Sequence, residues 1–113
     1  HSGGVIILGP SEKSYIENTC PGKPNYRLTD GTYVDCLTDT HAIEYERSKN
    51  WYESIGQSLY YATETNKKAG IVFIEVREDK RYLNRVLKTI KAQGLEDKID
   101  IWCLNDAHKF SLC

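Results

Sequence analysis

Two short strand patterns separated by a two-residue turn constrain the fold of this chain more than any other feature. Residues 32–38 and 41–47 are rich in β-branched and aromatic side chains, which are typical of β-strands. Asp39 and Thr40 lie between the two segments and suit a tight hairpin turn. The sequence therefore predicts an antiparallel hairpin.

The register of this hairpin brings acidic side chains together. If the loop is symmetric about its two residues, Asp35 lies opposite Glu44 and Tyr33 lies opposite Glu46. Because side chains alternate along a strand, the three acids share one face. Like charges opposite each other destabilise a sheet, and a hard cation would offset them. The alternative is an ordinary solvated face. The other face is predicted to be core: Val34, Cys36, Ile43 and Tyr45.

The rest of the chain predicts further helices and strands. Helices are expected at residues 12–19, 49–65 and 79–93. Strands besides the hairpin are expected at residues 26–28, 71–76 and 99–104. The predicted order is α-β-β-β-α-β-α-β, an α/β fold with a mixed sheet flanked by helices. Residues 20–25, with two prolines and a glycine, are predicted to form a loop.

The helix predicted over residues 49–65 has a core side and a polar side. Its apolar stripe consists of Trp51, Ile55, Leu59 and Ala62. Gln57 and Tyr61 follow an adjacent side, one turn apart. Gly56 lowers helix propensity, so we expect another backbone to approach closely there.

Composition limits the kind of protein this can be. A length of 113 residues suits a single domain over residues 1–113, in which residues 1–10 form a tail or an extra strand. The net charge of −1 predicts no bulk attraction to nucleic acid, so binding must use local cations. No apolar run reaches the roughly 20 residues of a membrane span, so no membrane partner is expected.

The four cysteines form no CxxC pair, so a structural zinc site is not expected. Cys36 and Cys103 lie in strand patterns and are predicted to be buried thiols. A disulfide of Cys20 with Cys36 or with Cys113 is the alternative, and it would need an oxidising compartment. The sequence leaves the localisation unknown: a cytoplasmic protein is favoured slightly over an exported one.

Several of these residues together resemble the PD-(D/E)XK, or restriction-endonuclease-like, nuclease superfamily. The resemblance covers roughly residues 11–76. It rests on Val34-Asp35, on Glu44-x-Glu46 after eight intervening residues, and on Gln57-x-x-x-Tyr61 in the next helix. Small single-domain members share further motifs with this chain: Ser11-Glu12-x-x-Tyr15, Val34 to Thr38, His41 to Glu44, Ile55-Gly56-Gln57 and Tyr60-Tyr61.

The chain departs from the superfamily at the position of a lysine. Glu46 stands where the pattern has the lysine that orients water and stabilises charge at phosphorus. An acid cannot stabilise that charge, although it could bind a second metal. Lys49 starts the next helix, and its long side chain could return to the site. The alternative for Lys49 is an ordinary exposed lysine. There is a second departure. The small single-domain members have a lysine directly followed by a tryptophan, whereas Asn50 separates Lys49 from Trp51 here.

The resemblance implies a Mg²⁺- or Mn²⁺-dependent nuclease that hydrolyses phosphodiester bonds, in DNA rather than RNA. Its implied metal ligands are Asp35, Glu44 and Glu46, and its implied catalytic residues are Asp35, Glu44, Lys49, Gln57 and Glu12. Substrate binding is expected at the local cations Lys49, Arg47 and Lys67 and at Tyr61 of the Gln-x-x-x-Tyr motif. The alternative is a decayed nuclease-fold module that binds nucleic acid or a protein without cleaving it. A third class is a secreted, disulfide-stabilised interaction domain. A homodimer is left open.

Overall fold

The computed structural model describes residues 11–74, 76, 80–104 and 110–113. Its helices are α1 (Glu12–Thr19), α2 (Trp51–Thr65) and α3 (Arg81–Ala92), and a single 3-10 turn, η1 (Ser48–Asn50), precedes α2. Its strands are β1 (Lys23–Arg27), β2 (Tyr33–Leu37), β3 (His41–Arg47), β4 (Lys68–Ile74), β5 (Ile99–Leu104) and β6 (Phe110–Leu112). The predicted order of elements is confirmed, and β6 is an addition. The predicted tail or strand at residues 1–10 lies outside the described residues.

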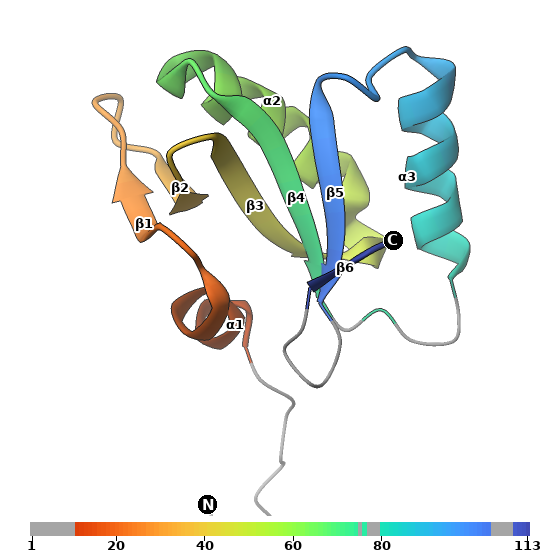
Figure 1. Ribbon diagram of the computed structural model, residues 1–113, viewed down its shortest axis with the longest axis horizontal. Coiled ribbons are helices and arrows are strands. Elements are labelled where there is room, and N and C mark those ends of the chain that lie inside the picture. Colours follow the sequence, from red (N-terminus) through yellow and green to blue (C-terminus); the bar gives the residue numbers. More distant parts are fainter. Residues whose placement is uncertain (1–10, 75, 77–79, 105–109) are drawn as a thin grey trace, which may run out of the picture.

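One mixed sheet forms the centre of the fold. Its strands lie side by side in chain order, from β1 to β6. The β3–β4 and β4–β5 pairs are parallel, because α2 and α3 provide the crossovers, and the other pairs are antiparallel. Figure 1 shows α2 and α3 beside the central strands and α1 next to β1. No helix among the described residues is long and apolar enough to cross a membrane.

The central strand β4 is buried on both faces. Ile71 and Phe73 pack in a cluster with α3, whereas Val72 and Ile74 pack in a second cluster with Tyr15 and Ile16 of α1. A continuous apolar run is what such a strand needs, because no side of it meets water. The helix α1 therefore covers the face of the sheet opposite to α3 and α2.

The predicted hairpin register is confirmed at the two pairs that the β2–β3 ladder contains, and the expected pairs Asp35–Glu44 and Tyr33–Glu46 are not part of this ladder. Cys36 pairs with Ile43, and Leu37 pairs with Ala42. Ile43 and Tyr45 pack with Cys36 on the α1 side, as predicted. Val34 is also fully buried, but it packs with Ala42 and Tyr61 in a separate cluster. The prediction that Val34 is a core residue is therefore confirmed, although it packs in a different cluster from Cys36.

The first strand begins earlier than predicted. β1 starts at Lys23 and includes Pro24 and Asn25, within the segment predicted to be a loop. Proline is tolerated because β1 is an edge strand, where a missing N–H need not interrupt a ladder. Asn25 adopts a left-handed conformation (φ 49°), which asparagine tolerates better than most residues.

The buried side of α2 also differs from the prediction. Trp51 is buried as expected, but the other buried residues are Ser54, Ser58 and Tyr61, while Ile55, Leu59 and Ala62 are only half-buried. The two serines donate their hydroxyls to carbonyls of their own helix, which allows small polar side chains to face the sheet. A Cβ at Gly56 would meet nothing within 4 Å, so the predicted close approach there is wrong.

All four cysteines form disulfides. Cys20 is bonded to Cys36, and Cys103 is bonded to Cys113. The prediction that Cys36 and Cys103 are thiols is wrong, whereas one of the two alternative pairings for Cys20 is confirmed. The packing of α1 against the sheet decides the first pair, because it brings the end of α1 beside β2.

Candidate functional site

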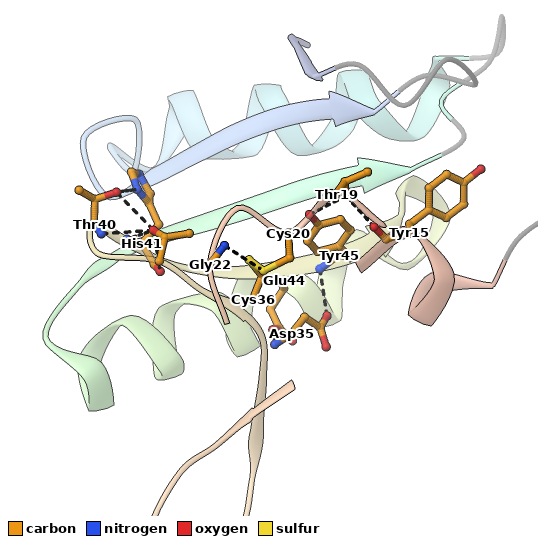
Figure 2. Close-up of a disulfide and its surroundings, with 11 residues drawn as sticks. Tyr15, Thr19, Cys20, Gly22, Asp35, Cys36, Thr40, His41, Glu44 and Tyr45 are labelled. Atoms are coloured by element: carbon orange, nitrogen blue, oxygen red, sulfur yellow. Dashed lines mark hydrogen bonds between the residues drawn. A yellow bond between two sulfur atoms is a disulfide. The ribbon is translucent and has the colours of Figure 1, made fainter. Parts of the chain in front are cut away.

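The candidate site lies where the β2–β3 ladder stops. Beyond the Cys36–Ile43 pair, the Asp35 N–H donates to Glu44 Oε2 at 3.0 Å. The Tyr45 N–H donates in turn to Asp35 Oδ2 at 3.0 Å. Two carboxylates thus take positions that strand carbonyls would otherwise fill. Figure 2 shows Asp35, Glu44 and Tyr45 together at this point.

The backbone of Tyr45 also faces this gap. Its N–H points toward Asp35, and the N–H and C=O of one strand residue point to the same side. The Tyr45 carbonyl is therefore directed toward the space between β2 and β3. A third oxygen donor, beside those of Asp35 and Glu44, is available there.

Two further acids lie next to this pair. Glu12, on α1, lies beside Glu46, and the charges of Glu46 and Asp35 act on it. Glu44 interacts electrostatically with Asp35, Glu46 and Glu12. We name Glu12, Asp35, Glu44 and Glu46 the carboxylate cluster. It joins α1, β2 and β3, so only the tertiary fold could assemble it.

Burial and mutual repulsion favour the protonated forms of these acids. Burial, the largest cause, and the charge of Asp35 raise the pKa of Glu44 from an ordinary 4.5 to about 8. Burial also raises the pKa of Asp35 from 3.8 to about 6. Burial and the neighbouring Glu46 carboxyl raise the pKa of Glu12 from 4.5 to about 7. Near neutral pH the cluster therefore holds protons that a bound cation would displace.

These pKa values predict how the stability of the metal-free protein depends on pH. The folded carboxyls bind protons that the unfolded chain has released, so stability must fall as the pH rises from about 4.5 to about 8. We expect the free energy of unfolding to fall by about 2–4 kcal/mol over this range. Urea denaturation in a chelating buffer at both ends of the range measures it. The Asp35→Asn/Glu44→Gln variant should flatten the profile, and stability that rises with pH would contradict the cluster.

Cations are sparse near these acids. Arg47 Nη1 lies 4.0 Å from Glu12 Oε2, which is a loose ion pair. The Asn50 side chain donates to Glu46 Oε1 at 3.4 Å, so η1 lies beside the cluster. Lys49, also in η1, is exposed, and no hydrogen bond or ion pair joins it to another described residue. Lys49, the candidate for the cation of the superfamily pattern, is thus close to Glu46 in the sequence. It contacts none of the acids of the carboxylate cluster in the described part of the chain.

The remaining predicted site residues lie at different distances from the cluster. Tyr61 is buried, and burial together with the charge of Glu44 raises its pKa. Gln57, one turn earlier in α2, is exposed and makes no hydrogen bond with any described residue. Lys67 donates to the Asp39 carbonyl at 2.7 Å, at the hairpin turn. This turn precedes β3, so Lys67 is held at the opposite end of β3 from Glu46.

Sequence reasoning missed two contacts that support the site. Thr19 Oγ1 lies 2.9 Å from the Tyr45 hydroxyl, and it also donates to the Tyr15 carbonyl at 2.6 Å. Asn50 contacts Glu46, as described above. The spacing of Glu46 and Asn50, four residues apart at the end of a strand, was the only available signal for the second contact. The first contact joins residues 26 apart in the chain and left no local signal.

His41 lies outside the cluster. Its Nε2 is 2.7 Å from Asp100 Oδ2, its Nδ1 is 2.7 Å from Thr40 Oγ1, and its ring packs edge-on against Trp102. Lys68 donates to the other oxygen of Asp100 at 3.1 Å. These contacts hold the starts of β3, β4 and β5 together, so His41 has a structural role.

The donor set suits a hard divalent cation. All its members are oxygens, which Mg²⁺ and Mn²⁺ prefer. Asp35 and Glu44 each accept a backbone N–H at one carboxylate oxygen, the kind of outer contact that orients metal ligands. No group of three or more His, Cys, Asp or Glu side chains in the described part of the chain already stands in ligating geometry. Binding would therefore require the acidic side chains to move.

No known family profile, curated protein or solved structure matches this chain. The restriction-endonuclease-like assignment therefore stays a resemblance carried by its residues. The carboxylate cluster itself is the feature that bears on function.

Proposed function

We propose that this protein is a metal-dependent nuclease that hydrolyses phosphodiester bonds, in DNA rather than RNA. The observation that carries the proposal is the carboxylate cluster, in which Glu44 is only 5% exposed. Gathering three further acids around a buried carboxyl, with only the loose ion pair of Arg47 to offset their charge, destabilises a protein, so such a cluster is usually retained for a purpose. A divalent cation supplies the missing charge.

The order of elements supports the same proposal. In the restriction-endonuclease-like arrangement, the acidic residues occupy two adjacent strands, and the following helix supports the site. Here Asp35 lies in β2, Glu44 and Glu46 lie in β3, and α2 follows directly. This combination resembles the nuclease superfamily.

The residues have distinct proposed roles. Asp35, Glu44 and the Tyr45 carbonyl would hold Mg²⁺ or Mn²⁺, and Glu46 would bind a second ion or a water. When bound, the metal lowers the pKa of a water molecule and offsets charge on the phosphate. Glu12, beside Glu46 at the cluster, would reach the metal through a water molecule.

The second candidate is a decayed nuclease-fold module that binds nucleic acid or a protein partner without cleaving it. Glu46 at the lysine position and the exposed Lys49 favour this alternative. An active enzyme needs a donor close to the phosphate in the transition state, whereas a binding module does not.

The disulfides bear on where the protein works. Both bridges would be reduced in an ordinary cytosol, so they support an exported protein. The third class, a secreted interaction domain, also requires bridged cysteines. Disulfides therefore do not separate an exported nuclease from an exported interaction domain, but cleavage does.

A cleavage assay tests the proposal. Oxidised protein should convert plasmid or single-stranded DNA to shorter products with Mg²⁺ or Mn²⁺, and a chelator should stop the reaction. The same titration should raise the melting temperature by mass action. Metal binding without cleavage of DNA or RNA would favour the decayed module. An unchanged melting temperature and no cleavage would exclude the metal-dependent nuclease.

A further inference from the structure

The helix α1, which carries Glu12, is short, and a small part of it is buried against the sheet. Only Tyr15 and Ile16 of its eight residues are buried. Ser11 caps its first turn through a hydrogen bond from the Ser14 N–H. Helices this short are marginal in water and depend on packing. The position of Glu12 is therefore only as secure as the docking of α1.

A disulfide fastens the other end of α1. Cys20 is the C-cap of the helix, and its N–H donates to the Ile16 carbonyl. Its sulfur is bonded to Cys36, which is fully buried in β2 and follows Asp35 directly. The bond thus links the helix that carries Glu12 to the strand that carries Asp35, as Figure 2 shows for Cys20, Cys36 and Asp35.

Neighbouring contacts make this link stiff. Thr19, next to Cys20, contacts the Tyr45 hydroxyl at 2.9 Å, and the Tyr45 N–H donates to Asp35. A Cβ on Gly22 would lie 2.2 Å from the Leu37 carbonyl oxygen, so the loop after Cys20 lies directly against β2. The disulfide and these contacts together set where α1 leaves the sheet.

We propose that the Cys20–Cys36 disulfide is a redox-controlled tether that keeps Glu12 at the carboxylate cluster, so that reduction by a dithiol releases α1 and weakens metal binding. The part about metal binding rests on the proposed function, whereas the release of α1 does not. The device would keep the cluster complete in an oxidising compartment and open it in a reducing one.

The two sulfurs differ in access, which defines the reduction step. Cys20 is half-buried and Cys36 is fully buried, so a thiolate of the dithiol attacks Cys20. The Cys20–Cys36 bond breaks, and Cys36 leaves as a thiolate and takes up a proton. The second thiol of the reductant then displaces Cys20 as a thiol, and the reductant becomes a cyclic disulfide. Two electrons and two protons pass to the protein.

The second disulfide provides a matched control. Cys103 lies in β5 and Cys113 follows β6, so their bond links neighbouring strands and touches neither α1 nor β2. Reduction acts on both bonds, but Cys113→Ser removes only this one. Cys20→Ser removes only the tether and places a small polar residue at a half-buried position.

Hydrogen exchange followed by mass spectrometry tests the release of α1. In Cys20→Ser, and in wild type with a dithiol, the amides of residues 12–19 should exchange faster by on the order of a hundredfold, the effect of losing a cross-link that closes a loop of this size. The β3 and β4 amides should stay protected. Oxidised Cys113→Ser should match oxidised wild type in residues 12–19.

Metal titration with Mn²⁺ tests the consequence. The dissociation constant should rise about tenfold to a hundredfold in Cys20→Ser, the usual effect of losing an outer contact to a metal site. Glu12→Gln should weaken binding similarly with α1 still protected. Unchanged exchange in α1 on reduction would overturn the tether, whatever the metal does. Oxidised wild type that binds no metal would instead overturn the proposed function, and the exchange data would still decide the tether.

Discussion

Asp35→Asn combined with Glu44→Gln is expected to reduce metal-dependent cleavage by about three orders of magnitude or more, because both proposed metal ligands lose their charge. The amide oxygens can still accept the two backbone hydrogen bonds that these carboxylates now accept. The change also removes repulsion within the carboxylate cluster. The metal-free variant should therefore be at least as stable as wild type near neutral pH.

Two measurements check this prediction. The cleavage rate and the rise in melting temperature with Mg²⁺ or Mn²⁺ should both disappear in the double variant. A matched control is Glu96→Gln combined with Asp97→Asn, which removes the same charges from exposed positions between α3 and β5. The control should behave as wild type. An equal rise in melting temperature in wild type and in the Asp35/Glu44 variant would exclude the site.

Lys49→Ala is expected to lower turnover by roughly two orders of magnitude while metal binding is kept, the scale of losing one charge-stabilising donor. Glu46 provides no cation near the phosphate, so the donor must come from elsewhere. Asn50 contacts Glu46, which places η1 and Lys49 beside the cluster. The exposed side chain of Lys49 is free to swing toward a bound phosphate.

Further variants separate this role from a general effect of charge. Lys49→Arg should recover only part of the rate, because a guanidinium differs in shape and hydration. Glu46→Lys should partly rescue Lys49→Ala if both positions reach the same phosphate. Lys88→Ala, which removes an exposed lysine from α3, is the charge-matched control. If turnover survives Lys49→Ala unchanged, Lys49 has no catalytic role, and Arg47 beside Glu12 becomes the cation to test.

Local sequence was enough to predict the hairpin and the order of elements. Asp39 and Thr40 define a two-residue loop, so the pairing of Cys36 with Ile43 followed from counting along two adjacent strands. The apolar run of β4 and the periodicity of α3 were equally local signals. In each case the side chains that carry the signal lie within one element or across one tight turn.

The faces of the elements were harder to predict, because they depend on what packs against them. Hydrophobic periodicity favoured Ile55 and Leu59 as the core side of α2, yet Ser54 and Ser58 are the fully buried residues. The serines satisfy their hydroxyls within the helix, which a hydrophobic pattern does not register. Whether Pro24 can lie within a strand likewise depends on the position of that strand, because proline is tolerated at the edge of a sheet and β1 is an edge strand.

The sequence by itself determined that Asp35, Glu44 and Glu46 would lie together on one hairpin, because strand alternation and a two-residue turn are local rules. Only the tertiary structure decided that Glu44 is buried, that side chains replace the β2–β3 ladder beside it, and that Glu12 completes the cluster. The tertiary structure also determined that Cys20 is bonded to Cys36. Burial, pKa and disulfide pairing depend on contacts between elements far apart in the chain, and no local pattern records those contacts.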